Sequence, residues 1–578
     1  MIRSVFINIK KVYKYAINYR KYLFIYLLFV PFISAISVLI PLFLAKEIVF
    51  VNDALYNELL KMALIILLVE IFNQAAEYIS RMSLLIYFRK TMRMLKIKVL
   101  KSVMHIKNKD LDELSTGAII ERINSDCNNM AEIIPNLVDN LIGILSNIGI
   151  LLAIFIINKI LFVYLLSGAI IIFIFKNMSI KYMYEYEKRS RKQRDKVTSF
   201  ITELVKGIRD IKVLNANTSF INETEKRILE HDKIVYTGRK VQNGYSFLTE
   251  VIYSLINFIF IVLSIVLIKN NYLSLPGFIA LFYYIERIYS MFNFYTHLQE
   301  DFKDFDLSCK RVFEVIEGNT FEKERFGSKE IKKIKGNFEF RNVNFAYKEK
   351  VPVLKDVSFK VKANTTVAFV GKSGAGKTTI FGLLAKLYEA NSGDILIDNI
   401  NINDLTEKAI RSNMTIINQS PYIFNMSIYD NMKLVSPKAS KKDIINACKA
   451  ACLDDFIESL PDKYDTVVGE GGILLSGGQK QRLAIARALV QKTKIILFDE
   501  ATSALDNETQ KSIQDAINNM QGDFTILIIA HRFSTVINSD KIIYIDDGKI
   551  IAEGTHDELL KTCKGYKKLY ELELKNNV

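Results

Sequence analysis

A short segment rich in glycine, with a lysine and a threonine at its end, has the composition of a phosphate-binding loop. It reads GKSGAGKT and consists of Gly371, Lys372, Ser373, Gly374, Ala375, Gly376, Lys377 and Thr378. The apolar run TTVAFV precedes it and a helix-forming run follows, which is the strand, loop and helix context that this motif requires. The glycines let backbone N–H groups wrap phosphates, Lys377 supplies a fixed positive charge to the outer phosphates, and the Thr378 hydroxyl can bind Mg²⁺. The sequence therefore predicts a nucleotide site here and disfavours a merely structural turn.

Two adjacent carboxylates, Asp499 and Glu500, end another apolar run in KIILFDE. Residues 494–498 have the pattern of a buried parallel strand, and α/β sheets place ligands at the carboxyl ends of such strands. We expect Asp499 to hold Mg²⁺ and Glu500 to polarise an attacking water. Asp-Glu pairs are common on solvated surfaces, but the buried strand and the phosphate loop favour the catalytic interpretation.

Three further side chains each have a functional and a structural interpretation. His531 follows a third strand-like run, FTILIIA, and could contact a γ-phosphate or serve only in packing. The amide of Gln419, in IINQSPYIF, could reach Mg²⁺ or water, or could cap a turn. Tyr347, in NFAY, lies before the phosphate loop, and its ring could stack on a base.

A second candidate anion site opens the helix-like run QKQRLAIARALVQ. The preceding residues are Ser476, Gly477 and Gly478, and Gln479 begins the run. Unpaired N–H groups and the positive end of the helix dipole would both face whatever lies in front of this helix. One nucleotide seldom needs two such sites, so the second requires an explanation beyond a single chain.

The first half of the chain contains six apolar runs, each near the length of about 20 residues that a helix needs to span hydrocarbon. They cover residues 22–45, 59–77, 135–157, 160–175, 247–268 and 275–294. The first is too long for a signal-peptide core and is expected to be a retained anchor. The fourth lies so close to the third that a buried soluble helix is an alternative for it.

The distribution of basic residues predicts the orientation of these runs in the membrane. The long polar stretches after the second and fourth runs are dense in Lys and Arg, whereas the other connections are short and carry few basic residues. The positive-inside bias therefore places both termini and both long loops in the cytoplasm. Within the second run, Glu70, Asn73, Gln74 and Glu77 share one helix face. This polar stripe has two interpretations, the lining of a pathway that attracts cations or a structural helix contact, and Glu77 could also lie outside the bilayer.

Composition excludes several classes of protein. The chain has 578 residues, 50% of them hydrophobic, which is enough for several domains and for membrane spans. Its net charge of +15 is spread over loops beside the apolar runs and does not interleave with stacking aromatics, which disfavours nucleic acid as a partner. The five cysteines lack the spacing of a metal site and are expected to be reduced thiols. Abundant Lys, Ile and Asn are typical of a low-GC bacterium.

The motifs GKSGAGKT, Gln419, LSGGQ, ILFDE, SALD and His531 occur in the order found in ATP-binding-cassette (ABC) proteins, and the chain resembles that family. LSGGQ is highly specific to it. Six spans followed by one cassette resemble a half-transporter of the type I exporter group for drugs, lipids or peptides, and the resemblance covers essentially the whole chain. TVVGEGG at 466–472 is similar to the exporter-specific loop, although many relatives have Arg where this chain has Gly471. KNKDLDELSTG, with a coupling helix near 110–114, and ELVKGIRDIKVLNAN are similar to the two intracellular loops of these exporters, the second of which engages the partner chain in the family.

The resemblance implies a fold and a role for each candidate residue. The fold would be an all-α membrane domain of six helices at 1–326, with long cytoplasmic loops, a linker at 327–336, and an α/β P-loop NTPase cassette with a helical subdomain at 337–578. In the site, Tyr347 would stack on adenine, residues 371–379, including Thr379, would hold phosphates, and Glu500 would be the catalytic base. Mg²⁺ would be served by Thr378, Gln419 and Asp499, while His531 would contact the γ-phosphate and residues 503–506 would cross a dimer interface.

These implications favour ATP-driven efflux of a drug, lipid or peptide across the cytoplasmic membrane by alternating access, with cassette and termini in the cytoplasm. Two cassettes would close around two ATP molecules with Mg²⁺, so the chain would pair with a second half-transporter chain in a homodimer or a heterodimer. Ser476, Gly477, Gly478 and Gln479 would then be the lid over the partner's ATP. An ATP-gated channel or membrane regulator is the alternative within the family. The six spans oppose a soluble cassette ATPase, and import is disfavoured.

Overall fold

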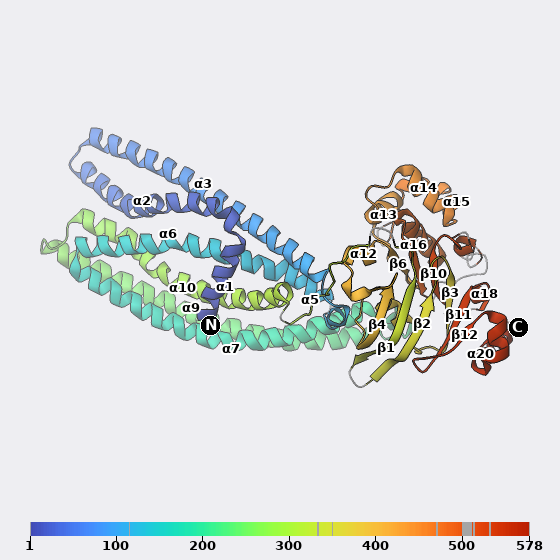
Figure 1. Cartoon of the computed structure of the whole chain (residues 1–578). Helices are drawn as coiled ribbons and strands as arrows, with labels where there is room; N and C mark the ends of the chain where they lie inside the picture. Colours follow the sequence, from blue (N-terminus) through green and yellow to red (C-terminus); the bar gives the residue numbers. More distant parts are fainter. Residues whose placement is uncertain are drawn as a thin grey trace. The chain divides into compact units, whose positions relative to one another are not determined.

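The computed structural model divides the chain into two compact units (Figure 1). It describes residues 2–114, 116–318, 320–331, 334–348, 351–469, 472–499, 511, 515–518, 520–530 and 533–576. Unit 1 contains Met1–Met104 and Thr116–Thr320, and unit 2 contains His105–Ser115 and Phe321–Val578. The helical half of the chain is thus interrupted by a short segment that belongs with the second half.

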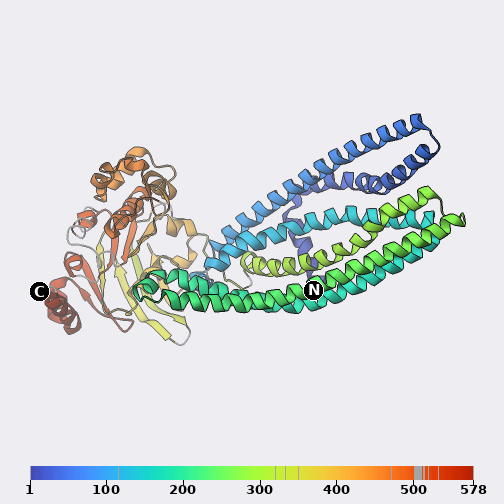
Figure 2. The same ribbon diagram turned by 180° about the vertical axis from the view of Figure 1, so that it is seen from behind.

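Unit 1 consists of helices in the residues that the structure describes. Its elements are α1 (Ile2–Tyr15), the 3₁₀ turn η1 (Ile17–Tyr19), α2 (Arg20–Asn52), α3 (Tyr56–Val103), α5 (Thr116–Glu121), the π-helical turn η2 (Arg122–Asp126), α6 (Cys127–Ile157), α7 (Lys159–Lys206), α8 (Ile208–Val213), α9 (Asn217–Lys269) and α10 (Leu275–Glu317). The pairs α2 with α3, α7 with α9, and α6 with α10 pack along much of their lengths (Figures 1 and 2).

The polar stretches expected as long loops are mostly continuations of the apolar helices. Helix α3 extends through the second apolar run and the basic stretch after it, and α7 does the same for the fourth run. Neither helix contains proline, and the basic stretches are rich in Lys, Arg, Glu and Met, which are good helix formers. Charge density therefore marks where the apolar part of the helix ends, and the helix itself continues.

Five helical segments of the described part are long and apolar enough to cross a bilayer. They are Ile17–Val51, Tyr56–Val103, Thr116–Ile157, Lys159–Ser179 and Asn217–Lys269. The fourth apolar run is among them. The sixth expected span falls on α10, where the apolar run in the described residues, Leu275–Ile285, is shorter. Polar caps separate adjacent spans: the Asn158 side chain accepts hydrogen bonds from the first N–H groups of α7, and Ser274 does so for α10.

Unit 2 is an α/β domain, and its described residues form three sheets. Its strands are β1 (Phe338–Lys348), β2 (Val351–Val361), β3 (Thr366–Val370), β4 (Ser392–Ile397), β5 (Ile400–Asn401), β6 (Met414–Ile417), β7 (Met426–Ser427), β8 (Val467–Val468), β9 (Ile495–Asp499), β10 (Thr525–Ile529), β11 (Lys541–Asp546) and β12 (Lys549–Gly554). An antiparallel sheet has the order β2-β1-β4-β5, and β7 pairs with β8. The largest sheet has the order β12-β11-β3-β10-β9-β6 and is parallel except at β12.

Helices and turns in the described residues of unit 2 complete this α/β arrangement. They are α4 (Asn108–Glu113), α11 (Lys377–Leu384), η3 (Ile402–Asp404), α12 (Glu407–Arg411), α13 (Ile428–Val435), α14 (Lys441–Ala450), α15 (Asp454–Glu458), η4 (Lys463–Asp465), α16 (Gly477–Gln491), α18 (Phe533–Val536), α19 (His556–Thr562) and α20 (Lys564–Asn576). Helices α13 to α16 form the helical part that the sequence predicts for a cassette (Figure 1).

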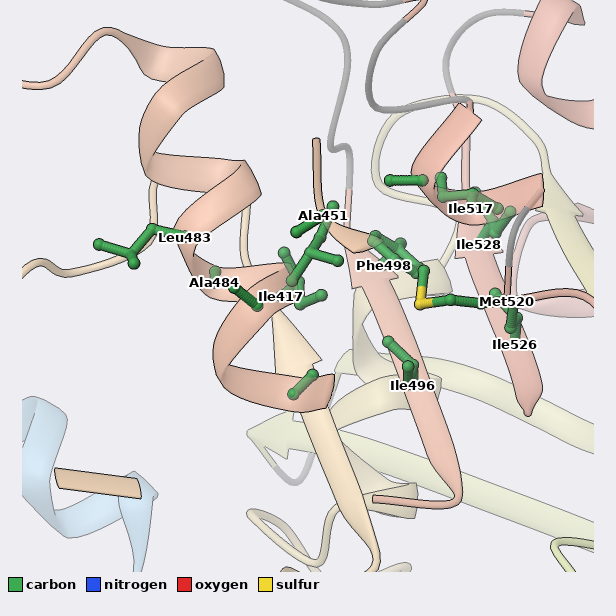
Figure 3. Packing of buried hydrophobic residues seen from close by; sticks show 14 of the residues in the cluster. Ile417, Ala451, Leu483, Ala484, Ile496, Phe498, Ile517, Met520, Ile526 and Ile528 are labelled. Atoms are coloured by element: carbon green, nitrogen blue, oxygen red, sulfur yellow. The ribbon is translucent and has the colours of Figure 1, made fainter. Parts of the chain in front are cut away.

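The six-stranded sheet has a separate apolar core on each face, because side chains alternate along a strand. One core contains Ala368, Val370, Ile496, Phe498, Ile526 and Ile528. The other contains the residues between them, Val367, Phe369, Ile495, Leu497, Leu527 and Ile529. In Figure 3, Leu483 and Ala484 of α16 lie on the side of the first core. The central strands are therefore buried on both faces and are rigid supports for the loops at their carboxyl ends.

The segment His105–Ser115 packs against residues far along the chain within unit 2. The backbone N–H of Lys107 donates to the carbonyl oxygen of Glu322 at 2.9 Å, and the N–H of Glu324 donates to that of His105 at 2.8 Å. The Lys107 ammonium also lies 2.8 Å from a carboxylate oxygen of Glu322 and 3.0 Å from one of Glu389. These contacts make the segment that contains α4 a part of the second unit.

Candidate functional site

The phosphate loop lies between the buried strand β3 and helix α11, as the sequence predicts. A Cβ atom on Gly371 would lie 2.1 Å from the carbonyl oxygen of Ile545 in β11, so no side chain fits there. Gly374 and Gly376 have φ angles of 80° and 96°, in the left-handed region that glycine tolerates best. The backbone therefore bends sharply at the end of β3, and α11 begins without a side-chain cap.

Lys377 lies in the first turn of α11, and its side chain curls back over the loop. Its ammonium donates to the carbonyl oxygens of Gly371 at 2.8 Å and Lys372 at 2.9 Å. The residue is only 5% exposed. The positive charge is thus held inside the glycine-rich loop, where the sequence predicts contact with phosphate oxygens.

Thr378 and Asp499 approach each other although they are 121 positions apart. The Thr378 hydroxyl donates to a carboxylate oxygen of Asp499 at 3.3 Å. The two residues follow β3 and end β9, and β10 pairs in parallel with both strands. A hydroxyl and a carboxylate are oxygen ligands of the kind that Mg²⁺ prefers, so these residues fit the predicted metal role.

Tyr347 lies beside the first turn of α11, directly after the phosphate loop. Its hydroxyl lies 3.0 Å from the Thr379 hydroxyl at the start of α11. The edge-on packing of its ring against Phe345 and Tyr388 fixes its orientation, with centroid distances of 4.9 and 5.1 Å. The residue remains 42% exposed, so part of the ring is open to a stacking partner.

The second candidate anion site is the N-terminus of α16, where a capping box forms. The Ser476 hydroxyl accepts a hydrogen bond from the Gln479 N–H at 3.2 Å, and the Gln479 side-chain oxygen accepts one from the Ser476 N–H at 2.8 Å. Ser476 and Gly477 are exposed, whereas Gly478 is buried. Of the four residues expected to form a lid, Ser476 and Gly477 are therefore open to a second molecule, and Gln479 organises the helix end.

Gln481 connects this helix to the segment that contains Gln419, and sequence reasoning did not identify it. The Gln481 side-chain amide donates to the backbone oxygen of Gln419 at 3.1 Å, and Gln481 is 3% exposed. A signal was present, because Gln481 begins the otherwise apolar i, i+3, i+4, i+7 stripe that continues with Ala484, Ile485 and Ala488. A polar residue on a buried face needs a hydrogen-bond partner, and here the partner is a candidate site residue.

Arg487 makes a second connection from α16 to the same segment. Its guanidinium donates to the carbonyl oxygen of Tyr422 at 2.9 Å and to the side-chain oxygen of Asn431. Burial lowers the pKa of Arg487 to about 10, so the group stays charged at neutral pH. The carbonyl oxygens of Gln419 and Tyr422 thus attach this segment to the helix that begins at the candidate lid.

Several predicted residues lie outside the described part of the chain. They are Glu500, Gly471, His531 and residues 503–506. Their expected roles remain predictions. Asp499, directly before Glu500, ends β9, and Ala530, directly before His531, follows the neighbouring strand β10 of the same sheet.

Comparisons with known proteins match both halves of the chain. Residues 354–503 match the family model described as ABC transporter, and residues 23–291 match the model described as ABC transporter transmembrane region. An ATP-dependent lipid A-core flippase of Mannheimia succiniciproducens is 32% identical over 523 residues, which are 89% of this chain and 88% of the relative. A protein of the same name from Legionella pneumophila (strain Lens) is 32% identical over 491 residues, covering 84% and 82% of the two chains.

A relative with a different name matches nearly as well. The Bacillus subtilis (strain 168) protein YgaD, provisionally named a multidrug export ATP-binding/permease protein, is 33% identical over 471 residues, 79% of each chain. With the spans and the phosphate loop on one polypeptide, these matches establish that the chain belongs to the ABC transporter family. Its architecture is that of a type I exporter half-transporter, a membrane protein that binds ATP and couples its hydrolysis to export.

Proposed function

We propose that two such chains export an amphipathic drug or lipid across the cytoplasmic membrane by alternating access, with cassettes and termini in the cytoplasm. Each ATP would lie between the phosphate loop of one chain and the Ser476–Gly477 end of α16 of the other. Contacts made only in the closed pair would favour one conformation, and hydrolysis would release it. The second chain is either an identical copy or a different half-transporter chain.

One observation carries the catalytic part of the proposal, the approach of Thr378 to Asp499 at 3.3 Å. Mg²⁺, when bound there, would neutralise phosphate charge. Lys377 would bind the outer phosphates, Tyr347 would orient the base, and Gln419 would complete the metal shell. Glu500, as the next residue after Asp499, would accept a proton from the attacking water, and His531 would contact the γ-phosphate.

The paired arrangement is supported by the exposure of Ser476 and Gly477 at the start of α16. An exposed helix N-terminus favours an anionic ligand, and within one chain the phosphate loop already provides a phosphate site. Ser476→Arg should leave ATP binding in place and prevent ATP-dependent closure of the two cassettes. Cross-linking that proceeds normally in this variant would contradict the shared site.

The cargo proposal rests on the names of the relatives and on α3. Glu70 and Gln74 are exposed on this helix, whereas Glu77 is half-buried and forms an ion pair with Arg81. Because Arg81 offsets the charge of Glu77, Glu70 is the main candidate for attracting a cation. This favours an amphipathic cargo with positive charge over a strongly anionic one.

The central test replaces Glu500 by Gln in the full chain in lipid vesicles. We expect most ATP turnover and transport to be lost while ATP binding is retained, because the proton acceptor is removed and the phosphate loop is unchanged. Glu571→Gln, at an exposed position of α20, is the matched control and should be fully active. Undiminished hydrolysis by the Glu500 variant would overturn the assignment. Hydrolysis without uptake of any dye or lipid into inside-out vesicles would instead favour a channel or regulator.

A further inference from the structure

Helix α1 has one side packed against the protein and another side whose side chains are exposed. Val5, Val12 and Ala16 are at most 1% exposed and face the other helices of unit 1. On the same side, Asn8 donates a hydrogen bond to Asp306 at 3.1 Å, and the Lys11 ammonium lies 3.0 Å from Glu317. Both carboxylates belong to α10, so α1 is held in one orientation on the bundle.

The outward side of α1 has a basic stripe between apolar residues. Arg3, Lys10 and Lys14 are exposed, and steps of seven and four residues place them on one line along the helix. Phe6 and Tyr13, 63% and 39% exposed, lie seven residues apart on one flank of this stripe. Ile7, 53% exposed, lies on its other flank. Apolar and cationic groups side by side on one face are typical of a helix in a membrane interface.

The position of α1 agrees with such an interface. Ala16 and η1 connect it directly to α2, whose apolar run begins at Tyr22. Figures 1 and 2 both show α1 running across the long helices of unit 1, whereas α2 runs along them. If α2 crosses the bilayer, α1 therefore lies roughly in the plane of the membrane surface, at the level where the hydrocarbon begins.

The positive charge on the outward face of α1 favours lipids with acidic headgroups. No Asp or Glu precedes Glu47, so the basic stripe has no acidic residue nearby in sequence. Lys11 has its own partner on α10, whereas Arg3, Lys10 and Lys14 are exposed and form no ion pair in the described residues. A cation near a surface that contains acidic lipid is attracted to it, and each added cation strengthens the attraction.

We propose that the outward face of α1 is a docking surface for acidic phospholipids of the leaflet in which α2 begins. Phe6 and Tyr13 enter the boundary between headgroups and acyl chains, and Arg3, Lys10 and Lys14 bind the lipid phosphates. The surface fixes the depth of the first span and collects acidic lipid beside it. It is independent of the cargo and of the ATP site.

The absence of tryptophan from the chain permits a direct test. Phe6→Trp supplies a single fluorescent reporter in the full chain, reconstituted in vesicles of phosphatidylcholine with a minor share of phosphatidylglycerol. Bromine on the acyl chains of one lipid at a time quenches a tryptophan that contacts that lipid. We expect quenching by both lipids, with phosphatidylglycerol more effective than an equal share of brominated phosphatidylcholine.

Charge variants in the same background separate the headgroup effect from simple insertion. Lys10→Gln with Lys14→Gln should remove the excess quenching by phosphatidylglycerol, and Lys10→Arg with Lys14→Arg should keep it. Each lost charge near an acidic surface corresponds to about a fivefold loss of local attraction at low salt. Lys441→Gln with Lys442→Gln on α14 removes the same charge elsewhere and should change nothing.

Phe32→Trp, a 54% exposed position within α2, is the reference for a tryptophan that contacts lipid without a headgroup preference. The proposal is overturned if the Phe6→Trp reporter is not quenched, as expected for a face covered by another protein or a second copy. It is also overturned if quenching does not depend on headgroup or on Lys10 and Lys14. ATP hydrolysis is measured in the same vesicles: loss of the lipid preference with normal hydrolysis rejects only the docking surface, whereas absent hydrolysis in the unmodified chain rejects only the proposed function.

Discussion

The two units use the same apolar residue types in opposite ways. In unit 2, Phe498 is fully buried, and the strands around it place alternate side chains in two cores. In unit 1, Phe24 is 71% exposed and Leu60 75% exposed, on helices that are among the most apolar of the chain. Burial within the protein therefore does not measure how well the apolar side chains of unit 1 are stabilised, because the outer ones require lipid as solvent.

The largest contrast should come from one substitution made in both units. Phe498→Ala removes a fully buried ring from the cassette core and should destabilise that unit by about 3–5 kcal/mol, through lost burial and a cavity. Phe24→Ala removes a ring that faces outward from α2 and should leave the cassette's unfolding temperature unchanged. Thermal unfolding of the full chain in lipid nanodiscs measures both, and equal shifts would break the comparison.

A smaller effect is expected from a single added methyl group at the phosphate loop. Gly371→Ala forces a Cβ against the Ile545 carbonyl oxygen and should cost about 1–3 kcal/mol while weakening ATP binding, because the loop must move. In Gly374→Ala, the added Cβ has no atom within 4 Å. The only cost is that alanine must adopt the left-handed φ of this position, which destabilises by about 1–2 kcal/mol. Nucleotide titration of the two variants compares crowding with backbone strain, and tighter binding by the Gly371 variant would refute the crowding argument.

The connection between α16 and Gln419 should matter more for activity than for stability. Gln481→Leu removes one hydrogen bond to the Gln419 carbonyl and should cost only about 1 kcal/mol in unfolding free energy. If that bond holds Gln419 in place, the KM for ATP or the cooperativity of hydrolysis changes in the variant. Gln491→Leu at the far end of the helix loses a bond to Arg411 instead and is the matched control. Identical kinetics in the two variants would make Gln481 a purely structural residue.

The smallest effect on stability is expected in the polar stripe of α3. Glu70 is exposed and has no ion pair among the described residues, so Glu70→Gln should change stability by less than about 0.5 kcal/mol. Its effect should appear only in cargo preference, as weaker stimulation of ATP hydrolysis by cationic dyes relative to neutral ones. Glu77→Gln, which leaves Arg81 without its carboxylate, should act more on local structure. If Glu70→Gln changes the stimulation of ATP hydrolysis by cationic and neutral dyes equally, Glu70 does not line the cargo pathway.

The sequence predicted the parts of the fold that depend on neighbours along the chain. Strand, loop and helix around Lys377, the strand that ends at Asp499 and the start of α16 after Ser476 all follow from local pattern, whereas the capping box that pairs the N–H groups of Ser476 and Gln479 was not predicted. The approach of Thr378 to Asp499 was also expected, because parallel strands bring their carboxyl ends to one edge.

Contacts between distant segments could not be predicted in the same way. Nothing near Gln481 reveals that its partner is the backbone of Gln419, since a carbonyl oxygen has no sequence signature. The continuation of α3 and α7 through basic stretches was missed because charge was taken as the end of a helix. Membership of His105–Ser115 in unit 2 depends on Glu322 and Glu389, which lie hundreds of positions away.

The membership of His105–Ser115 in unit 2 sets the order in which parts of the chain can fold during synthesis. Lys107 and Glu322 are separated by 215 positions, and six helical elements of unit 1, α5 to α10 with short turns between them, are synthesised in the interval. A ribosome adds residues far more slowly than a helix forms. The segment His105–Ser115 is therefore synthesised before its partners in unit 2 and has no contact with them while the intervening chain enters the membrane. We therefore expect pulse-chase proteolysis to find this segment cleavable in nascent chains that end at α10, and protected once the cassette is complete.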